Sequence, residues 1–109
     1  MTSLVRSLTT FTQREIRTLF RIARPVVVTP DLEVRTSPAT LEYGRILIVI
    51  PRRVGNAPQR NQLRRRIKAL FYEQRWFEQR IDAIVLTKPE SITLSFEQLR
   101  LLLAPAFKA

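Results

Sequence analysis

The stretch GRILIVIPRRVGNAPQRNQLRRRIK, residues 44–68, predicts a buried strand followed by a strongly basic helix. The run 45–50 is short, apolar and rich in β-branched residues, so we expect it to form the central strand of a sheet. Pro51 lacks the N–H that the next ladder hydrogen bond needs and should end that strand. Asn56 is a good helix cap and Pro58 is tolerated in a first turn, so a helix should begin here.

The predicted helix is amphipathic and about five turns long. The first half of its polar face carries positive charges alone. Like charges four residues apart repel, and cations near a helix start oppose the helix dipole, so this arrangement costs stability. We therefore interpret the face as a surface that binds a polyanion rather than as an ordinary solvated face. The apolar stripe on the other side contains Leu63, Ile67, Leu70, Phe71 and Phe77.

The flanking sequence supplies two more helices. Helical periodicity starts at Thr10 and should end near Ala23, just before a proline. Ser95 begins the last helix, because a serine followed three residues later by glutamine has the pattern of a capping box. Further strands are predicted at residues 26–28, 32–36 and 81–87.

The order of these elements, α-β-β-β-α-β-α, predicts an α/β (α+β) two-layer sandwich. A chain of 109 residues suits one domain with a single modest core. We expect a single RNA-binding domain over residues 1–109, of which residues 1–9 are frayed. A helix that joins two parallel strands is nearly always a right-handed crossover.

The composition favours a nucleic acid as the partner. The sequence has 19 Lys and Arg against 9 Asp and Glu, which gives a net charge of +10 at pH 7. Such a charge repels itself, and a polyanionic partner would relieve the repulsion. Most of the cations are arginines, whose planar group binds phosphate through two hydrogen bonds and stacks on bases. An anionic membrane and an acidic protein remain alternatives.

What the sequence lacks disfavours several other classes of protein. It has no Cys, and therefore no disulfide framework, thiolate metal site or cysteine nucleophile. No apolar run approaches the roughly 20 residues that a membrane span needs. The start of the chain has no signal-peptide pattern, and we expect a cytoplasmic protein.

Residues 52–68 resemble the signature of the bacterial ribonuclease P protein subunit. That signature has a basic pair, a small or apolar pair, an Arg-Asn-Arg group, and then aliphatic and basic residues in alternation. Residues 11–20 are similar to the first helix of this family. Residues 82–89 are similar to the strand and the Lys-Pro turn that follow the signature. The resemblance covers most of the chain.

The resemblance implies the protein partner of a catalytic RNA. Ribonuclease P is an endoribonuclease that removes the 5′ leader of precursor tRNA, and its RNA performs the hydrolysis. The expected partners are ribonuclease P RNA and the single-stranded leader, with no membrane and no small-molecule substrate. No cofactor is expected on the protein alone, whereas the RNA–protein holoenzyme requires Mg²⁺. The resemblance also implies the left-handed βαβ crossover of the ribosomal protein S5 domain 2-like fold, against the usual handedness.

The resemblance also implies two sets of site residues. Those that match the basic motif, and would bind the RNA subunit, are Arg52, Arg53, Arg60, Asn61, Arg64, Arg65 and Lys68. Those that match the leader-binding cleft are Phe20, Lys88 and Ile16. No residue is expected to be catalytic or to bind a metal. From the sequence alone, we would assign Phe20 to the core and Lys88 to an ordinary turn, and the first arginine pair could be solvated; the resemblance makes a stacking role for Phe20 as plausible as a core one.

Three positions depart from the family pattern. Gln62 stands where a second arginine is usual, so one RNA contact is weakened or replaced. Ile16 stands at a usual cleft phenylalanine and removes a stacking surface worth roughly 1–3 kcal/mol per base. Arg66 replaces a usually apolar residue, and we expect it to carry the charge that is missing at the glutamine. These departures put leader affinity in more doubt than binding to the RNA subunit.

Other functions remain as rivals. A self-sufficient enzyme is disfavoured because there is no His or Cys and the carboxylates are scattered. Another basic RNA-binding protein, similar to a ribosomal protein, would show the same charge without a role in tRNA processing. The predicted strands disfavour a helix-turn-helix protein. A helix that lies on a membrane surface would be revealed by binding to vesicles.

Overall fold

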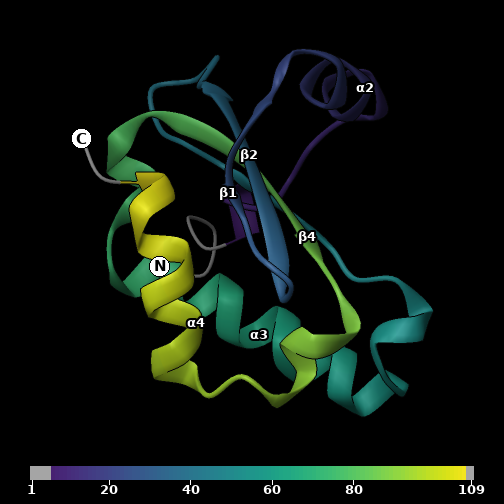
Figure 1. The fold of residues 1–109 in the computed structure, drawn as a ribbon. Helices are drawn as coiled ribbons and strands as arrows, with labels where there is room; N and C mark the ends of the chain where they lie inside the picture. Colours follow the sequence, from purple (N-terminus) through teal and green to yellow (C-terminus); the bar gives the residue numbers. More distant parts are fainter. Residues whose placement is uncertain (1–5, 108–109) are drawn as a thin grey trace.

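A computed structural model describes residues 6–107 and has a four-stranded sheet with helices on both faces (Figure 1). The predicted order of elements and the mixed α+β class are confirmed. Short 3-10 helices η1 (Arg52–Val54), η2 (Trp76–Gln79), η3 (Pro89–Thr93) and η4 (Ala104–Phe107) join or end the main elements. Those main elements are α2 (Gln13–Ile22), β1 (Arg24–Val28), β2 (Leu32–Pro38), β3 (Ile46–Val49), α3 (Ala57–Glu73), β4 (Ile81–Thr87) and α4 (Phe96–Leu103).

The strand order is β1-β2-β4-β3, which corrects one expectation from the sequence. The run that contains β3 was expected to be central, but β3 forms an edge of the sheet and pairs in parallel with β4 alone. β4 lies between β3 and β2, and its other neighbour is antiparallel. The chain passes from β3 to β4 through α3, as a βαβ unit requires. The left-handed sense of this crossover stays a prediction.

The outer edge of β3 is met by the start of the described chain. The backbone N–H of Ile46 donates a hydrogen bond of 2.8 Å to the carbonyl oxygen of Leu8. The Leu8 side chain is only 1% exposed and belongs to the hydrophobic core. The expectation of a frayed start is therefore wrong for residues 6–9, because an apolar side chain there completes the core beside the edge strand. Residues 1–5 lie outside the described part of the chain.

The two faces of the sheet differ because side chains alternate along each strand. Ala83 and Val85 of β4 point into the core beneath α3 and α4. Ile84 points the other way and is also fully buried. Figure 1 shows α2 and α3 on opposite sides of the sheet. On α3, the predicted apolar stripe is buried at Leu63, Ile67, Leu70 and Phe71.

The prediction of the apolar stripe is wrong for its last residue, Phe77. α3 ends at Glu73, and Arg75 has a left-handed backbone with φ of 55°, so Phe77 is not on the helix. Phe77 instead reaches the core from η2 and is 9% exposed. The preceding Trp76 is 8% exposed and stacks on Phe107 with ring centroids 4.9 Å apart, as a packing residue should.

Candidate nucleic-acid interface

The start of α3 is set by the residues that the sequence pattern singled out. Asn56 caps the helix, since its side chain accepts a hydrogen bond from the N–H of Gln59. The Gln59 side chain in turn accepts a hydrogen bond from the backbone N–H of Asn56 and completes a capping box. A Cβ at Gly55 would lie 2.6 Å from the Gln59 Oε1, so glycine leaves room for that side chain. These contacts fix the direction in which the basic helix leaves the sheet.

The cations of α3 lie in rows on different flanks of the helix. Arg60, Arg64 and Lys68 are spaced by four residues and therefore share one flank. Arg64 and Lys68 line a recess of about 190 Å³ with Ile46 and Ile48 of the edge strand. This row thus follows the β3 side of the helix.

Two exposed residues continue the basic surface over the crest of α3. Asn61 and Arg65 are both exposed, and their spacing by four residues places them on one row facing solvent. Within residues 6–107, no carboxylate forms an ion pair with any cation that was predicted to bind the RNA subunit. The charge of this surface is therefore available to a phosphate backbone.

Arg60 also connects the helix to the segment before it. Its Nη1 donates to the carbonyl oxygens of Arg52 and Gly55, at 3.5 Å and 3.4 Å. These contacts hold η1 against the start of α3, and the side chains of Arg52 and Arg53 are exposed there. The structure therefore brings the predicted basic pair and the predicted helix residues onto one continuous surface.

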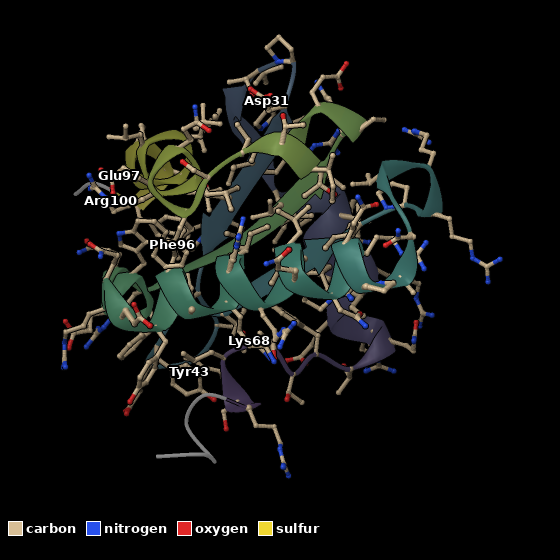
Figure 2. The ribbon with its side chains drawn as sticks, turned by 90° about the horizontal axis from the view of Figure 1, so that it is seen from below. Asp31, Tyr43, Lys68, Phe96, Glu97 and Arg100 are labelled. Atoms are coloured by element: carbon tan, nitrogen blue, oxygen red, sulfur yellow. The ribbon has the colours of Figure 1, made fainter. Side chains whose placement is uncertain are left out.

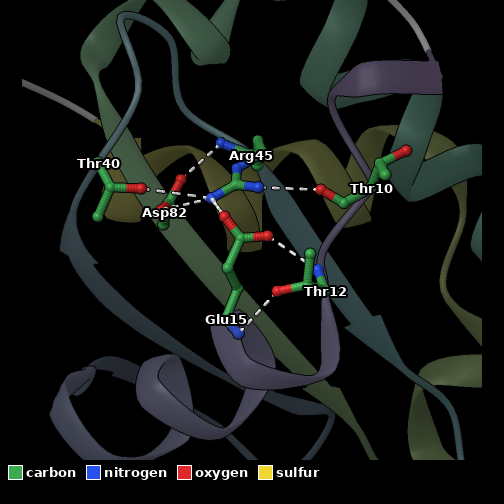
Figure 3. Close-up of polar contacts among 6 residues, drawn as sticks. All are labelled: Thr10, Thr12, Glu15, Thr40, Arg45 and Asp82. Carbon is green, nitrogen blue, oxygen red and sulfur yellow. Dashed lines mark hydrogen bonds and ion pairs between the residues drawn. The ribbon is translucent and has the colours of Figure 1, made fainter.

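On the opposite face of the sheet, Arg45 holds α2 in place (Figure 3). Its guanidinium donates to the backbone carbonyl of Thr10 at 3.0 Å and to Glu15 Oε2 at 3.1 Å. The same group lies 3.7 Å from Asp82 Oδ2, and the backbone N–H of Arg45 donates to Asp82 Oδ1 at 2.9 Å. The guanidinium also lies 4.4 Å from the centroid of the Phe11 ring. One buried arginine thus joins α2, the segment before it and two strands.

The two carboxylates of this cluster have opposite electrostatic environments. The hydrogen bond from Arg45 lowers the pKa of Glu15, and the backbone N–H of Thr12 acts in the same direction. Burial raises the pKa of Asp82, although the backbone hydrogen bond and the charge of Arg45 oppose that rise. Arg45 is 4% exposed, and its Nε has no hydrogen-bond partner within the described chain. Through these contacts the cluster positions α2 against the sheet.

The predicted cleft residues on α2 lie together, on one flank of the helix. Ile16 is half-buried and Phe20 is 39% exposed, and their spacing of four residues makes them neighbours. A cavity of about 170 Å³ also lies between α2 and the sheet, but it is lined by the other flank, including Thr18 and Ile22. Neither predicted residue lines that cavity. Phe20 presents an aromatic surface to solvent rather than to the core.

Lys88 is separate from these two residues. It follows the last residue of β4, whereas α2 lies over Asp82 near the first, and six strand residues span about 20 Å. The Lys88 Nζ donates a hydrogen bond of 2.8 Å to the carbonyl oxygen of Thr29. The next segment, η3, contacts η1. Lys88 therefore lies nearer to the basic surface than to Phe20.

Comparison with known proteins decides the family. The family model described as Ribonuclease P matches residues 6–109. The chain belongs to the ribonuclease P protein family. It is thus the protein subunit of ribonuclease P, an RNA-binding protein of tRNA processing. Among curated proteins, no relative matches the chain.

Solved structures of ribonuclease P proteins share the fold. The Staphylococcus aureus RNase P protein matches with a TM-score of 0.76 and 18% identity, over 89% of each chain. The RNase P protein from Thermotoga maritima matches with a TM-score of 0.77 and 20% identity, over 92% of this chain and 94% of that chain. In the described part of this ribonuclease P protein, no helix is long and apolar enough to cross a membrane.

Sequence reasoning missed Arg45 as a functional residue. The residue was assigned only to the start of an apolar strand, although a lone arginine that opens such a run is an unusual choice for a buried position. Sequence reasoning also assigned Phe96 only to the apolar face of the last helix, whereas the structure leaves this side chain 38% exposed. In both cases the partners come from distant parts of the chain, so local spacing contains no signal for them.

Proposed function

We propose that this ribonuclease P protein binds the catalytic RNA of ribonuclease P through one basic surface. That surface consists of Arg52, Arg53, Arg60, Asn61, Arg64, Arg65 and Lys68. The single observation that supports it most is the continuity of these cations across η1 and α3 without a carboxylate partner. Phosphate contacts of this kind provide affinity and position and do not read sequence.

In this proposal the RNA performs the hydrolysis and the protein acts through charge. Arginines that neutralise RNA phosphates reduce the concentration of Mg²⁺ that the RNA needs to fold and to dock its substrate. Among residues 6–107, no group of three or more His, Cys, Asp or Glu side chains could hold a metal ion. We assign the Mg²⁺ of the holoenzyme to the RNA, which performs the hydrolysis in this proposal.

The second part of the proposal concerns the 5′ leader of precursor tRNA. Ile16 and Phe20 lie on one flank of α2, and we assign the leader to this flank. Phe20 supplies one exposed ring on which an unpaired base can stack. Ile16, one helical turn earlier, has no ring, so stacking on this flank of α2 depends on Phe20 alone. Lys88 lies at the far end of β4 and would meet a more distant leader nucleotide.

A leader contact would make the protein favour substrate over product. Mature tRNA lacks the leader, so every contact to the leader strengthens binding of the precursor alone. We place this activity in the cytoplasm, with RNA partners and without a small-molecule substrate.

The deciding experiment is cleavage of a precursor tRNA by a bacterial ribonuclease P RNA at low Mg²⁺, with and without this protein. We expect removal of the 5′ leader to depend on the protein at low Mg²⁺ and to become independent of it at high Mg²⁺. A triple variant, Arg60→Ala, Arg64→Ala and Arg65→Ala, should lose the stimulation. Stimulation that survives in the triple variant would contradict the assignment of the basic surface.

A charge-matched control for the single Arg64→Ala variant removes one positive charge elsewhere on the chain. Arg75 is exposed and forms an ion pair with Glu78 beyond the end of α3. The Arg75→Ala variant should stimulate cleavage as well as the unaltered protein does. If the control and the Arg64→Ala variant lose stimulation equally, total charge rather than the named surface would explain the effect.

A further inference from the structure

A hollow lies on the flank of α3 that faces the start of α4. It has a volume of about 360 Å³ and is lined by Gln62, Arg65, Arg66 and Ala69 of α3 and by Phe96 of α4. The hollow is shallow and open to solvent, so it can admit one face of a ligand without enclosing it. It is therefore open enough to accept a flat ring system together with a charged group.

The hollow is on the other side of the helix from the recess beside β3. Figure 2 shows Phe96 and Lys68 on opposite sides of α3. Arg66 follows Gln62 by one helical turn and shares its flank, whereas Arg64 and Lys68 line the recess on the β3 side. The charge that the family usually has at position 62 is thus present one turn later, on the α4 flank.

Phe96 provides an aromatic surface at the edge of the hollow. It is the first residue of α4, and its side chain is 38% exposed. Although more than half of this residue is buried, the remainder is accessible to a ligand. Its flat face is open to stacking on a nucleobase.

Arg66 lines the same hollow. Its Nη1 donates a hydrogen bond of 3.3 Å to the carbonyl oxygen of Leu94, which holds the side chain against the segment before α4. Arg65 is exposed beside it. Within the described residues, neither arginine forms an ion pair with a carboxylate. The nearby Glu97 is paired with Arg100 through two hydrogen bonds, so its charge is neutralised within its own helix.

We propose that the hollow binds one unpaired nucleotide of RNA, with its base stacked on Phe96 and its phosphate held by Arg65 and Arg66. This inference rests on the proposed binding of RNA and adds a second surface to it, on the α4 flank of the helix. An aromatic ring next to unpaired arginines is the combination that single-stranded nucleic acid requires. The hydrogen bond from Arg66 to Leu94 also distinguishes this site from a surface with freely solvated charges.

The test uses the whole chain and a short oligouridine RNA that contains 5-iodouridine. Irradiation joins this base to an aromatic side chain on which it is stacked, and mass spectrometry of the digest identifies the residue. We expect an adduct on Phe96 that disappears in Phe96→Leu and persists at position 96 in Phe96→Tyr. Binding of the unmodified oligonucleotide should weaken about fivefold or more in Phe96→Leu and recover in Phe96→Tyr.

The control is Leu101→Ala, because Leu101 is 59% exposed on the same helix and does not line the hollow. It should bind the oligonucleotide as tightly as the unaltered protein, and thermal unfolding should show that all variants fold. Adducts confined to Phe11 or Phe20, with unchanged affinity in Phe96→Leu, would overturn the inference and leave the proposed function standing. If polyglutamate displaced the oligonucleotide equally from the unaltered protein and from Phe96→Leu, binding would depend on charge alone. That result would also overturn the inference. A protein that binds no RNA at all would overturn both proposals.

Discussion

The Arg45 guanidinium donates a hydrogen bond of 3.1 Å to the Glu15 carboxylate, across 30 residues of sequence. The arginine lies immediately before the edge strand, and the glutamate lies in the first turn of α2. The same glutamate accepts a hydrogen bond from the N–H of Thr12 and closes the capping box of its helix. One ion pair thus decides where α2 lies on the sheet, and with it the orientation of Phe20.

The first prediction concerns this ion pair and pH. The hydrogen bond from Arg45 holds the pKa of Glu15 below its usual value of 4.5. A carboxyl with a lowered pKa stabilises the folded state above pH 4.5, and this stabilisation is lost as the pH falls through the folded-state pKa. Glu15→Gln retains the capping box but not the charge. We expect the difference in unfolding free energy between the two proteins to be constant above pH 4.5 and to shrink below it, in urea titrations across that range. A difference that does not change with pH would contradict the role of the charge.

The second prediction concerns the buried partner of the same arginine. Arg45→Met leaves the Asp82 carboxylate buried without its cation, a type of change that costs about 3–5 kcal/mol. Adding Asp82→Asn removes that charge and keeps an oxygen that can accept from the backbone N–H of residue 45. We expect the double variant to regain part of the lost unfolding free energy, measured by urea denaturation. A double variant less stable than Arg45→Met would show that the aspartate is stabilising on its own.

The third prediction concerns the glycine before the edge strand. A Cβ at Gly44 would lie 2.3 Å from the carbonyl oxygen of Ile81, which belongs to the backbone and cannot rotate away. The N–H of Gly44 also donates a hydrogen bond of 2.7 Å to the Phe77 carbonyl oxygen. Gly44→Ala should therefore cost about 1–3 kcal/mol of unfolding free energy through overpacking. Gly55→Ala is the control, since its Cβ meets only the movable Gln59 side chain and should cost less.

The fourth prediction concerns the salt dependence of RNA binding. If Arg64 contacts one phosphate, Arg64→Ala should reduce the slope of log affinity against log salt concentration by roughly 0.7–0.9. Arg65→Ala should do the same, whereas Arg75→Ala should leave the slope unchanged because Arg75 is paired with Glu78. Fluorescence anisotropy with ribonuclease P RNA over a range of salt concentrations measures these slopes. Equal slopes in all four proteins would remove both arginines from the interface.

Much of the fold could be predicted because its signals are local. The strand at residues 81–87 was predicted with the bounds that the structure has. Asn56 and Ser95 were predicted as caps, and both close capping boxes with the residue three positions later. Such features depend on side chains within one helical turn or on alternation along one strand. They are therefore readable without knowledge of the rest of the chain.

The failures have a common physical cause. The expectation that β3 is central was wrong, although the run is apolar enough for a central strand. β4 pairs with it on one side, and the carbonyl oxygen of Leu8 accepts a hydrogen bond from it on the other. The prediction that Phe77 lies on the apolar stripe of α3 was wrong, because the left-handed backbone of Arg75 ends the helical register. The position of β3 depends on contacts between distant segments, and the end of α3 depends on one backbone conformation. Neither can be predicted from the periodicity of apolar residues.

For the candidate site, the sequence by itself determined its chemistry. The charge, the arginines, the caps and the family signature were all readable, because they depend on residue type and short spacing. The tertiary structure alone decided how these residues are distributed. It placed Arg64 and Lys68 beside β3, Arg66 beside Phe96, and Lys88 far from the aromatic position on α2. The reason is that the pairing of β3 with β4 and the packing of α4 on α3 are contacts over long sequence separations, and those contacts decide which flank of a helix meets which neighbour.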